Sequence, residues 1–152
     1  MHYPDVCAVV VTYRYPYTAL EALLESLDGP LGRVFLVDNN PRPDAVALAR
    51  LEQLFGRCRV LANHANLGLS KALNRGIEQA LGEGFAWLLL FDQDSRPTPP
   101  MLQRLLAARS EIDAAAIGPC VYDERLGSPL PFLSFGWRGV RRHWPDPGQH
   151  HL

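Results

Sequence analysis

Two carboxylates follow directly on a run of seven apolar residues. Residues 85–91 read FAWLLLF and lead straight into Asp92 and Asp94. Such a run predicts a strand buried on both faces of a sheet, with the carboxylates at its carboxyl end. Open α/β sheets bind ligands at that edge, and carboxylate oxygens suit hard divalent cations. The pair therefore predicts a site for a divalent cation together with the phosphates of a substrate.

Two further polar clusters follow apolar runs. Thr12 and Tyr13 come after residues 6–11, and Asp38 to Asn40 come after residues 34–37. If the strands are parallel, all three clusters meet at one edge of the sheet. The Tyr13 ring suits stacking on a base, and the Asp38 carboxylate suits accepting a hydrogen bond from a ring N–H. By themselves, Asp38 and Asn40 also suit an Asx turn, and Tyr13 suits covering the sheet edge.

The elements that must position these clusters alternate along the chain. Short apolar runs predict strands at 6–11, 34–37, 58–61, 85–91 and 114–117. Apolar residues at helical spacing predict four helices between or after these strands, with inward faces formed by Leu20, Leu23, Leu24 and Leu27, by Leu48, Leu51 and Phe55, by Leu73, Ile77 and Leu81, and by Leu102, Leu105 and Leu106. This alternation predicts an α/β fold with a mostly parallel twisted sheet and helices on both faces.

The chain changes character near residue 122. We expect residues 1–122 to form an α/β domain. Residues 123–152 are rich in Pro, Gly and aromatic residues and show no sustained period. They predict either an irregular segment packed by its aromatic side chains or a partly disordered tail.

Composition narrows the classes of protein. The 152 residues suit one domain, and the net charge of −1 gives no overall field that would recruit nucleic acid. Three cysteines, Cys7, Cys58 and Cys120, predict small buried apolar groups in a reducing compartment rather than a disulfide framework. No signal peptide or membrane span is recognisable, so we expect a cytoplasmic protein and leave peripheral membrane contact open.

Four stretches in this order resemble the family 2 glycosyltransferases. They are residues 9–13 (VVVTY), 37–40 (VDNN), 66–77 (NLGLSKALNRGI) and 89–95 (LLFDQDS). The last stretch is most similar to the rhamnosyltransferase branch. The resemblance covers about residues 5–122, and the combination is far more specific than any single motif.

The resemblance implies a GT-A fold and a nucleotide-diphosphate sugar as donor, with dTDP-rhamnose as the candidate, bound with Mg²⁺ or Mn²⁺. The residues matching Thr12, Tyr13 and Asp38 would meet the base, while Asp92 would lie near the ribose and Asp94 would bind the metal. The remaining expected nucleotide-binding residues are Asn40, Asn66, Gly68 and Lys71. Asn66 and Gly68 would shape the loop before a helix. Lys71 and Arg75 lie on the polar face of that helix, which in the simplest interpretation only faces solvent; we prefer that interpretation for Arg75. Lys71 lies nearer the helix N-terminus, where a diphosphate would be attracted, so we expect it to be a weak ligand.

Family members extend well beyond this length, with an acceptor site and a carboxylate general base that have no match in this sequence. We therefore expect a truncated, donor-binding half of an inverting glycosyltransferase. Its partners would be a glycan or lipid-linked acceptor and a second copy or another chain. One alternative is a non-catalytic nucleotide-sugar-binding domain. A remoter one is a phosphatase of the haloacid dehalogenase type, whose nucleophilic carboxylate needs a downstream Lys, whereas the single Lys71 precedes Asp92.

Overall fold

The computed structural model describes residues 2–109, 111, 115–119, 122–123, 125–137 and 139–144. The chain divides into two compact units, Met1–Pro99 and Pro100–Leu152. The two units meet at residues 99 and 100, whereas the sequence predicts a domain boundary near residue 122. That domain boundary stays a prediction. Each unit is described by itself below.

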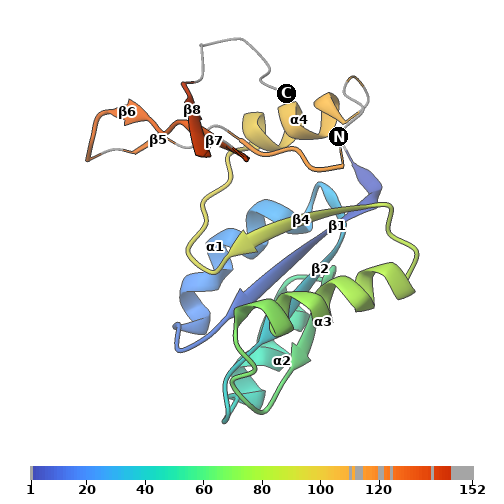
Figure 1. Cartoon of the computed structure of the whole chain (residues 1–152). Helices are drawn as coiled ribbons and strands as arrows, with labels where there is room; N and C mark the ends of the chain where they lie inside the picture. Colours follow the sequence, from blue (N-terminus) through green and yellow to red (C-terminus); the bar gives the residue numbers. More distant parts are fainter. Residues whose placement is uncertain are drawn as a thin grey trace. The chain divides into compact units, whose positions relative to one another are not determined.

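The first unit alternates strands and helices as the sequence predicts (Figure 1). Its elements in chain order are β1 (Tyr3–Thr12), α1 (Tyr17–Asp28), β2 (Leu31–Asp38), α2 (Ala45–Leu54), β3 (Cys58–Ala62), α3 (Leu69–Gly82) and β4 (Trp87–Asp92). The strands form one parallel sheet in the order β3-β2-β1-β4. The predicted parallel α/β architecture is confirmed.

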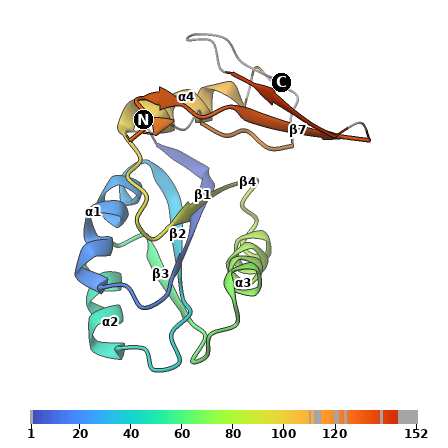
Figure 2. The same cartoon turned by 60° about the vertical axis from the view of Figure 1, so that its left-hand side comes forward.

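The core lies on β1 and β2, the two central strands. Residues 6–11 of β1 are buried, as are residues 34–37 of β2, because each strand has neighbours on both sides and helices over both faces. Figure 2 shows α1 and α2 on one side of the sheet and α3 on the other. The predicted inward face of α1 is confirmed, since Leu20, Leu23, Leu24 and Leu27 are all buried.

Two of the cysteines behave as predicted. Cys7 and Cys58 are free thiols buried in the sheet. Burial raises the pKa of each thiol to about 12, so both are neutral and inert near pH 7. Cys120 lies outside the described residues.

The inward face of α3 differs from the prediction. Its buried residues are Ala72, Gly76 and Ala80, whereas Leu81 is 60% exposed. Small side chains allow the helix to lie directly on the sheet: a Cβ added to Gly76 would come within 2.4 Å of Val9 Cγ1. The helix therefore turns its small residues inward, and the row of large apolar residues flanks the contact.

The prediction that residues 85–91 form a strand buried on both faces was wrong. The strand begins at Trp87, pairs with β1 and, within the described part of the chain, is the edge of the sheet, so its residues are half-buried or exposed. Leu90 is 53% exposed. An apolar run indicates that its side chains favour burial. It does not indicate whether the strand has a neighbour on one side or on both.

The second unit contains α4 (Pro99–Ala108) and two small antiparallel sheets. β5 (Tyr122–Asp123) pairs with β6 (Ser128–Pro129), and β7 (Phe132–Gly136) pairs with β8 (Gly139–His143). The described part of the expected strand at 114–117 carries no strand, and Ala114 lies outside the described residues. Within the segment expected to be irregular at 123–152, the described residues form the strands β6, β7 and β8, because short strands separated by Gly and Pro have no long period. Residues 124, 138 and 145–152 lie outside the described residues, so for them the expectation stays a prediction.

Among the described residues, no helix has the length and apolar character needed to cross a bilayer.

Candidate functional site

Strand register brings the three polar clusters to one edge of the sheet. Thr12, the last residue of β1, pairs with Asp38, the last residue of β2. On the other side of β1, Val11 pairs with Asp92 at the end of β4. Positions far apart in the sequence therefore become neighbours at the carboxyl edge, where parallel sheets bind ligands.

A pocket of about 440 Å³ opens at this edge. Its lining includes the predicted residues Tyr13, Asn66, Gly68, Asp92 and Asp94. Residues to which the sequence analysis gave no role of their own complete the lining: Val11, Asn39, Leu69 and Gln93. The volume is in the range of small-molecule sites, and the polar groups converge from four separate segments of the chain.

The other predicted residues lie beside the pocket without lining it. Thr12 and Asp38 are fully buried, and the Thr12 hydroxyl has no hydrogen-bond partner among the described residues. Asn40 is half-buried and Lys71 is exposed near the start of α3. Their roles toward a nucleotide stay predictions.

Asp38 is the centre of a local hydrogen-bond network. Its Oδ2 accepts from the Tyr17 hydroxyl at 2.5 Å, and its Oδ1 accepts from the Asn40 backbone N–H and from Asn40 Nδ2, each at 2.7 Å. The bond to the Asn40 N–H is the Asx turn that the sequence suggests. Both carboxylate oxygens therefore hold the loop after β2 in place, and Tyr17 joins that loop to α1.

Tyr17→Phe is expected to destabilise the fold by about 1–2 kcal/mol, because it leaves a buried carboxylate oxygen without its donor. The pKa of Tyr17 is raised from 10.0 to about 12. Burial is the larger cause, and the hydrogen bond to Asp38 is the second. The folded chain thus holds this proton more tightly than the unfolded chain. The resulting stability is present below pH 10 and is lost as the pH rises toward 12.

Urea unfolding at pH 8 and pH 11 measures both effects. Tyr17→Phe should have the lower midpoint at pH 8 and should lose less stability than the wild type between the two pH values. Tyr15→Phe is the control, because Tyr15 makes no side-chain hydrogen bond in the described structure. Equal pH dependence of the wild type and Tyr17→Phe would refute the proposed linkage.

Asn39 joins the loop after β2 to the loop before α3. Its Oδ1 accepts from Asn63 Nδ2 at 2.9 Å and from the Leu67 N–H at 3.0 Å, and its Nδ2 donates to Asn66 Oδ1 at 3.0 Å. Asn66 Oδ1 also accepts from the Gly68 N–H. Asn39 is only 3% exposed, so this amide network fixes the pocket wall from within.

Gly68 starts α3 in a conformation that favours glycine. Its φ is +79°, and no side chain caps the helix. The first amide N–H groups of a helix lack intrahelical acceptors and carry a partial positive charge. Gly68 and Leu69 line the pocket, so this end of a 14-residue helix lies at the site.

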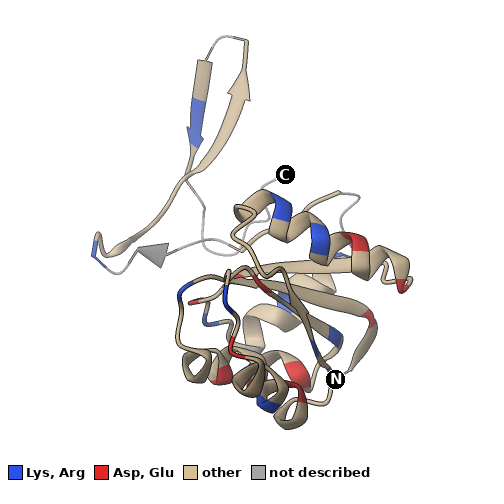
Figure 3. Cartoon of the chain, turned by 90° about the horizontal axis from the view of Figure 1, so that it is seen from below, with Lys and Arg blue, Asp and Glu red and all other residues tan. Residues whose placement is uncertain are grey.

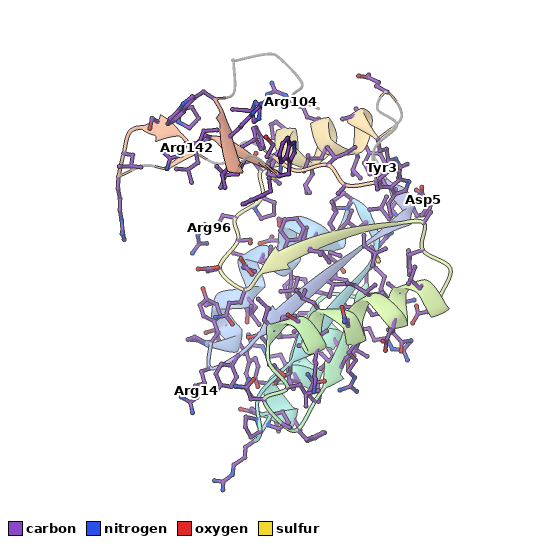
Figure 4. All side chains as sticks on the ribbon, in the orientation of Figure 1. Tyr3, Asp5, Arg14, Arg96, Arg104 and Arg142 are labelled. Atoms are coloured by element: carbon purple, nitrogen blue, oxygen red, sulfur yellow. The ribbon has the colours of Figure 1, made fainter. Side chains whose placement is uncertain are left out.

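Gln93 connects the turn that holds the two carboxylates with the loop after β1. Its Oε1 accepts from the Tyr13 backbone N–H at 2.9 Å. The guanidinium of Arg14, which Figure 4 labels on the loop after β1, lies over the Tyr13 ring at 5.1 Å from its centroid, in a cation–π contact. No role for Gln93 was predictable, because nothing in the sequence indicates which group the amide between the two carboxylates would bind.

Asp92 and Asp94 lie on a tight turn in which the Ser95 N–H donates to the Asp92 carbonyl. Both side chains are exposed, and within the described chain neither forms an ion pair or hydrogen bond. The described residues contain no group of three or more His, Cys, Asp or Glu side chains placed for a metal ion. Two carboxylates beside a pocket fit Mg²⁺ bound jointly with substrate phosphates, because such sites use one or two carboxylates and complete the shell with phosphate and water oxygens.

The chain matches the model of the Glycosyl transferase family 2 over residues 7–144. It is 28% identical over 137 residues to the dTDP-rhamnosyl transferase RfbF of Shigella flexneri, covering 90% of this chain and 45% of that protein. It is 31% identical over 137 residues to the galactofuranosyltransferase GlfT1 of Mycolicibacterium smegmatis (strain ATCC 700084 / mc(2)155), covering 85% of this chain and 44% of that protein. The chain thus spans less than half the length of these relatives.

Among solved structures, residues 1–349 of S. aureus TarS share the fold. The TM-score is 0.52 at 18% identity, with 78% of this chain and 40% of that chain covered. The expected GT-A architecture, represented by its parallel sheet with helices on both faces, is confirmed. Because the family model spans nearly the whole sequence, the chain belongs to glycosyltransferase family 2.

Proposed function

We propose that this chain binds a nucleotide-diphosphate sugar together with Mg²⁺ or Mn²⁺ and serves inverting transfer of the sugar to a hydroxyl acceptor. The observation that carries the proposal is the pocket at the carboxyl edge, where Tyr13, Gly68 and the pair Asp92 and Asp94 converge. The family relationship supports glycosyl transfer as the chemistry. The name of the Shigella flexneri relative supports dTDP-rhamnose as the donor.

Each part of the pocket suits one part of such a donor. The Tyr13 ring offers a surface for the base, with Thr12 and Asp38 beside it at the strand ends. The amide groups at the start of α3 suit the diphosphate, because a helix N-terminus attracts phosphate. Asp92, on the turn that lines the pocket, would lie near the sugar of the nucleotide.

Asp94, with Asp92, would hold the metal ion. When bound, the metal neutralises the diphosphate and so stabilises it as a leaving group. The protein's own residues orient the donor: the Gln93 bond to the Tyr13 N–H fixes the base-side loop against the carboxylate turn, and Asn39 fixes the wall that carries Gly68. The acceptor hydroxyl would attack the anomeric carbon on the side opposite the diphosphate.

The acceptor, a glycan or a lipid-linked sugar, and any second copy or partner chain are part of the proposal. No residue of the described pocket is assigned as the base that deprotonates the acceptor. The non-catalytic alternative therefore remains the second candidate, because the relatives are more than twice as long as the aligned region. The phosphatase alternative is set aside, since the chain belongs to a glycosyltransferase family.

Release of dTDP from dTDP-rhamnose separates the two candidates. We expect the full chain to release dTDP in the presence of Mn²⁺, by transfer to an added hydroxyl acceptor or to water, and not after chelation of the metal. Metal-dependent binding of the donor without any release of dTDP would favour the non-catalytic domain. Absence of donor binding with Mn²⁺ present would contradict both.

A further inference from the structure

The hairpin formed by β7 and β8 has two chemically different faces. Paired residues of an antiparallel ribbon point to the same side, so the pairs Leu133 with Arg142 and Phe135 with Val140 share one face. We call Leu133, Phe135 and Val140 the apolar hairpin face. The opposite face carries Ser134 and His143, whose Oγ and Nε2 atoms lie 2.8 Å apart, together with Phe132 and Arg141.

The apolar hairpin face is exposed. Phe135 is 78% exposed, and Trp137 in the turn beyond it is 90% exposed. Leu133 is 50% exposed and Val140 is 56% exposed. Exposed apolar residues gathered on one face indicate a binding surface more often than scattered ones do, and a two-stranded hairpin is marginally stable without further contacts.

The charge of this segment is one-sided. Residues 132–143 contain three of the chain's 15 basic residues, Arg138, Arg141 and Arg142, and none of its 16 acidic residues. Figure 3 shows basic residues but no acidic ones on the described ribbon of this hairpin. The chain as a whole has a net charge of −1, so the hairpin is a local basic region on an otherwise acidic protein.

We propose that the apolar hairpin face docks on an anionic lipid surface. Leu133, Phe135 and Val140 enter the boundary between headgroups and acyl chains, and Trp137 lies at the interface, where Trp is enriched. Arg142 at the end of the apolar face (Figure 4) and Arg141 on the other face contact lipid phosphates. The proposal does not depend on the donor site.

A lipid surface fits these observations better than the other occupants. A nucleic acid would use Arg together with flat aromatic platforms. Phe135 and Trp137 offer such platforms, but the neighbouring Leu133 and Val140 are aliphatic and match acyl chains better than bases. A second copy would bring the same arginines close to one another, because a two-fold interface repeats each surface. Anionic headgroups instead match the charge, and acyl chains match the aliphatic residues.

Co-sedimentation of the full chain with lipid vesicles tests the proposal. We expect binding to mixed phosphatidylglycerol and phosphatidylcholine vesicles, little binding to phosphatidylcholine alone, and weaker binding at high salt. The double variant Arg141→Gln/Arg142→Gln should lower the partition coefficient about 25-fold, or about 5-fold for each charge. Its matched control is Arg42→Gln/Arg104→Gln, which removes one exposed arginine from the loop before α2 and one from α4 and should leave partition unchanged.

A second variant tests the apolar contact. Phe135→Ser/Trp137→Ser should lower partition at least about 10-fold, and an unchanged unfolding midpoint would show that the fold persists. The proposal is overturned if partition is the same on neutral vesicles or survives both hairpin variants. It is also overturned if the chain ignores vesicles and instead binds single-stranded RNA, or forms a dimer that Phe135→Ser/Trp137→Ser dissociates.

Discussion

Asp94→Asn is expected to lower the affinity for dTDP in the presence of Mn²⁺ by about 100-fold while leaving the weaker, metal-free affinity nearly unchanged. The substitution keeps the size of the side chain but removes the charge that we assign to the metal. Substitutions of groups that only orient metal ligands cost about 10–100-fold in metal affinity, so loss of a ligand should cost at least as much. Titration calorimetry with dTDP, with Mn²⁺ and with chelator, measures both affinities.

The control for Asp94→Asn is Glu25→Gln on α1, which removes the same charge from an exposed position outside the pocket. It should bind dTDP and Mn²⁺ as the wild type does. Asp92→Asn should weaken dTDP binding less than Asp94→Asn, since we assign Asp92 to the sugar of the nucleotide as well as to the metal, and Asp94 to the metal alone. An Asp94→Asn protein with full metal-dependent affinity would show that this carboxylate does not hold the metal.

Gly76→Ala is expected to destabilise the first unit by about 2 kcal/mol, although Ala is the better helix former. The new Cβ would lie 2.4 Å from Cγ1 of Val9 and 3.1 Å from Cγ2 of Val37. Both valines are buried in the central strands and have short, stiff side chains, so they have little freedom to move aside. The helix would have to lift from the sheet and carry Gly68 and Leu69, at its pocket end, with it.

Gly82→Ala in the last turn of the same helix is the matched control. A Cβ there meets no atom within 4 Å, so the substitution should be neutral or stabilise by up to about 1 kcal/mol. Thermal unfolding of the two variants should then differ by several degrees, since 1 kcal/mol shifts the midpoint of a chain of this size by about 2–4 °C. Equal midpoints for Gly76→Ala and Gly82→Ala would contradict close packing of α3 on the sheet.

The central part of the fold could be predicted because its signals are local. β-branched runs at 6–11 and 34–37 become the two strands with neighbours on both sides, and the leucines of α1 face inward as their spacing indicates. The run at 85–91 has the same apolar character but becomes an edge strand. The order of strands in the sheet depends on contacts between residues far apart in the sequence. A pattern read over a short stretch of sequence does not contain that information.

The face of α3 shows a second limit. Large residues at 73, 77 and 81 carry the stronger hydrophobic signal, yet Ala72, Gly76 and Ala80 make the close contact. Small residues bury little area, so a pattern of hydrophobicity undervalues them. Their advantage is the short distance between helix and sheet that they allow.

The candidate site was predictable in its outline and not in its connections. Carboxylates and aromatic residues at strand ends mark the pocket, and Tyr13, Asp92 and Asp94 do line it. Asn39 and Gln93 lie within the polar clusters, but the sequence assigns them no role because an amide is equally common in any polar loop. Their importance lies in specific partners, the Leu67 N–H and the Tyr13 N–H, that only the folded chain brings within reach.

The most direct test of the account is a crystal structure of this chain with dTDP and Mn²⁺. The anomalous signal of manganese should lie against the Asp94 carboxylate, with the diphosphate between the metal and the start of α3 and the thymine beside Tyr13. A nucleotide bound away from the pocket lined by Tyr13, Gly68 and Asp94, or manganese bound there without contact to Asp94, would contradict the account.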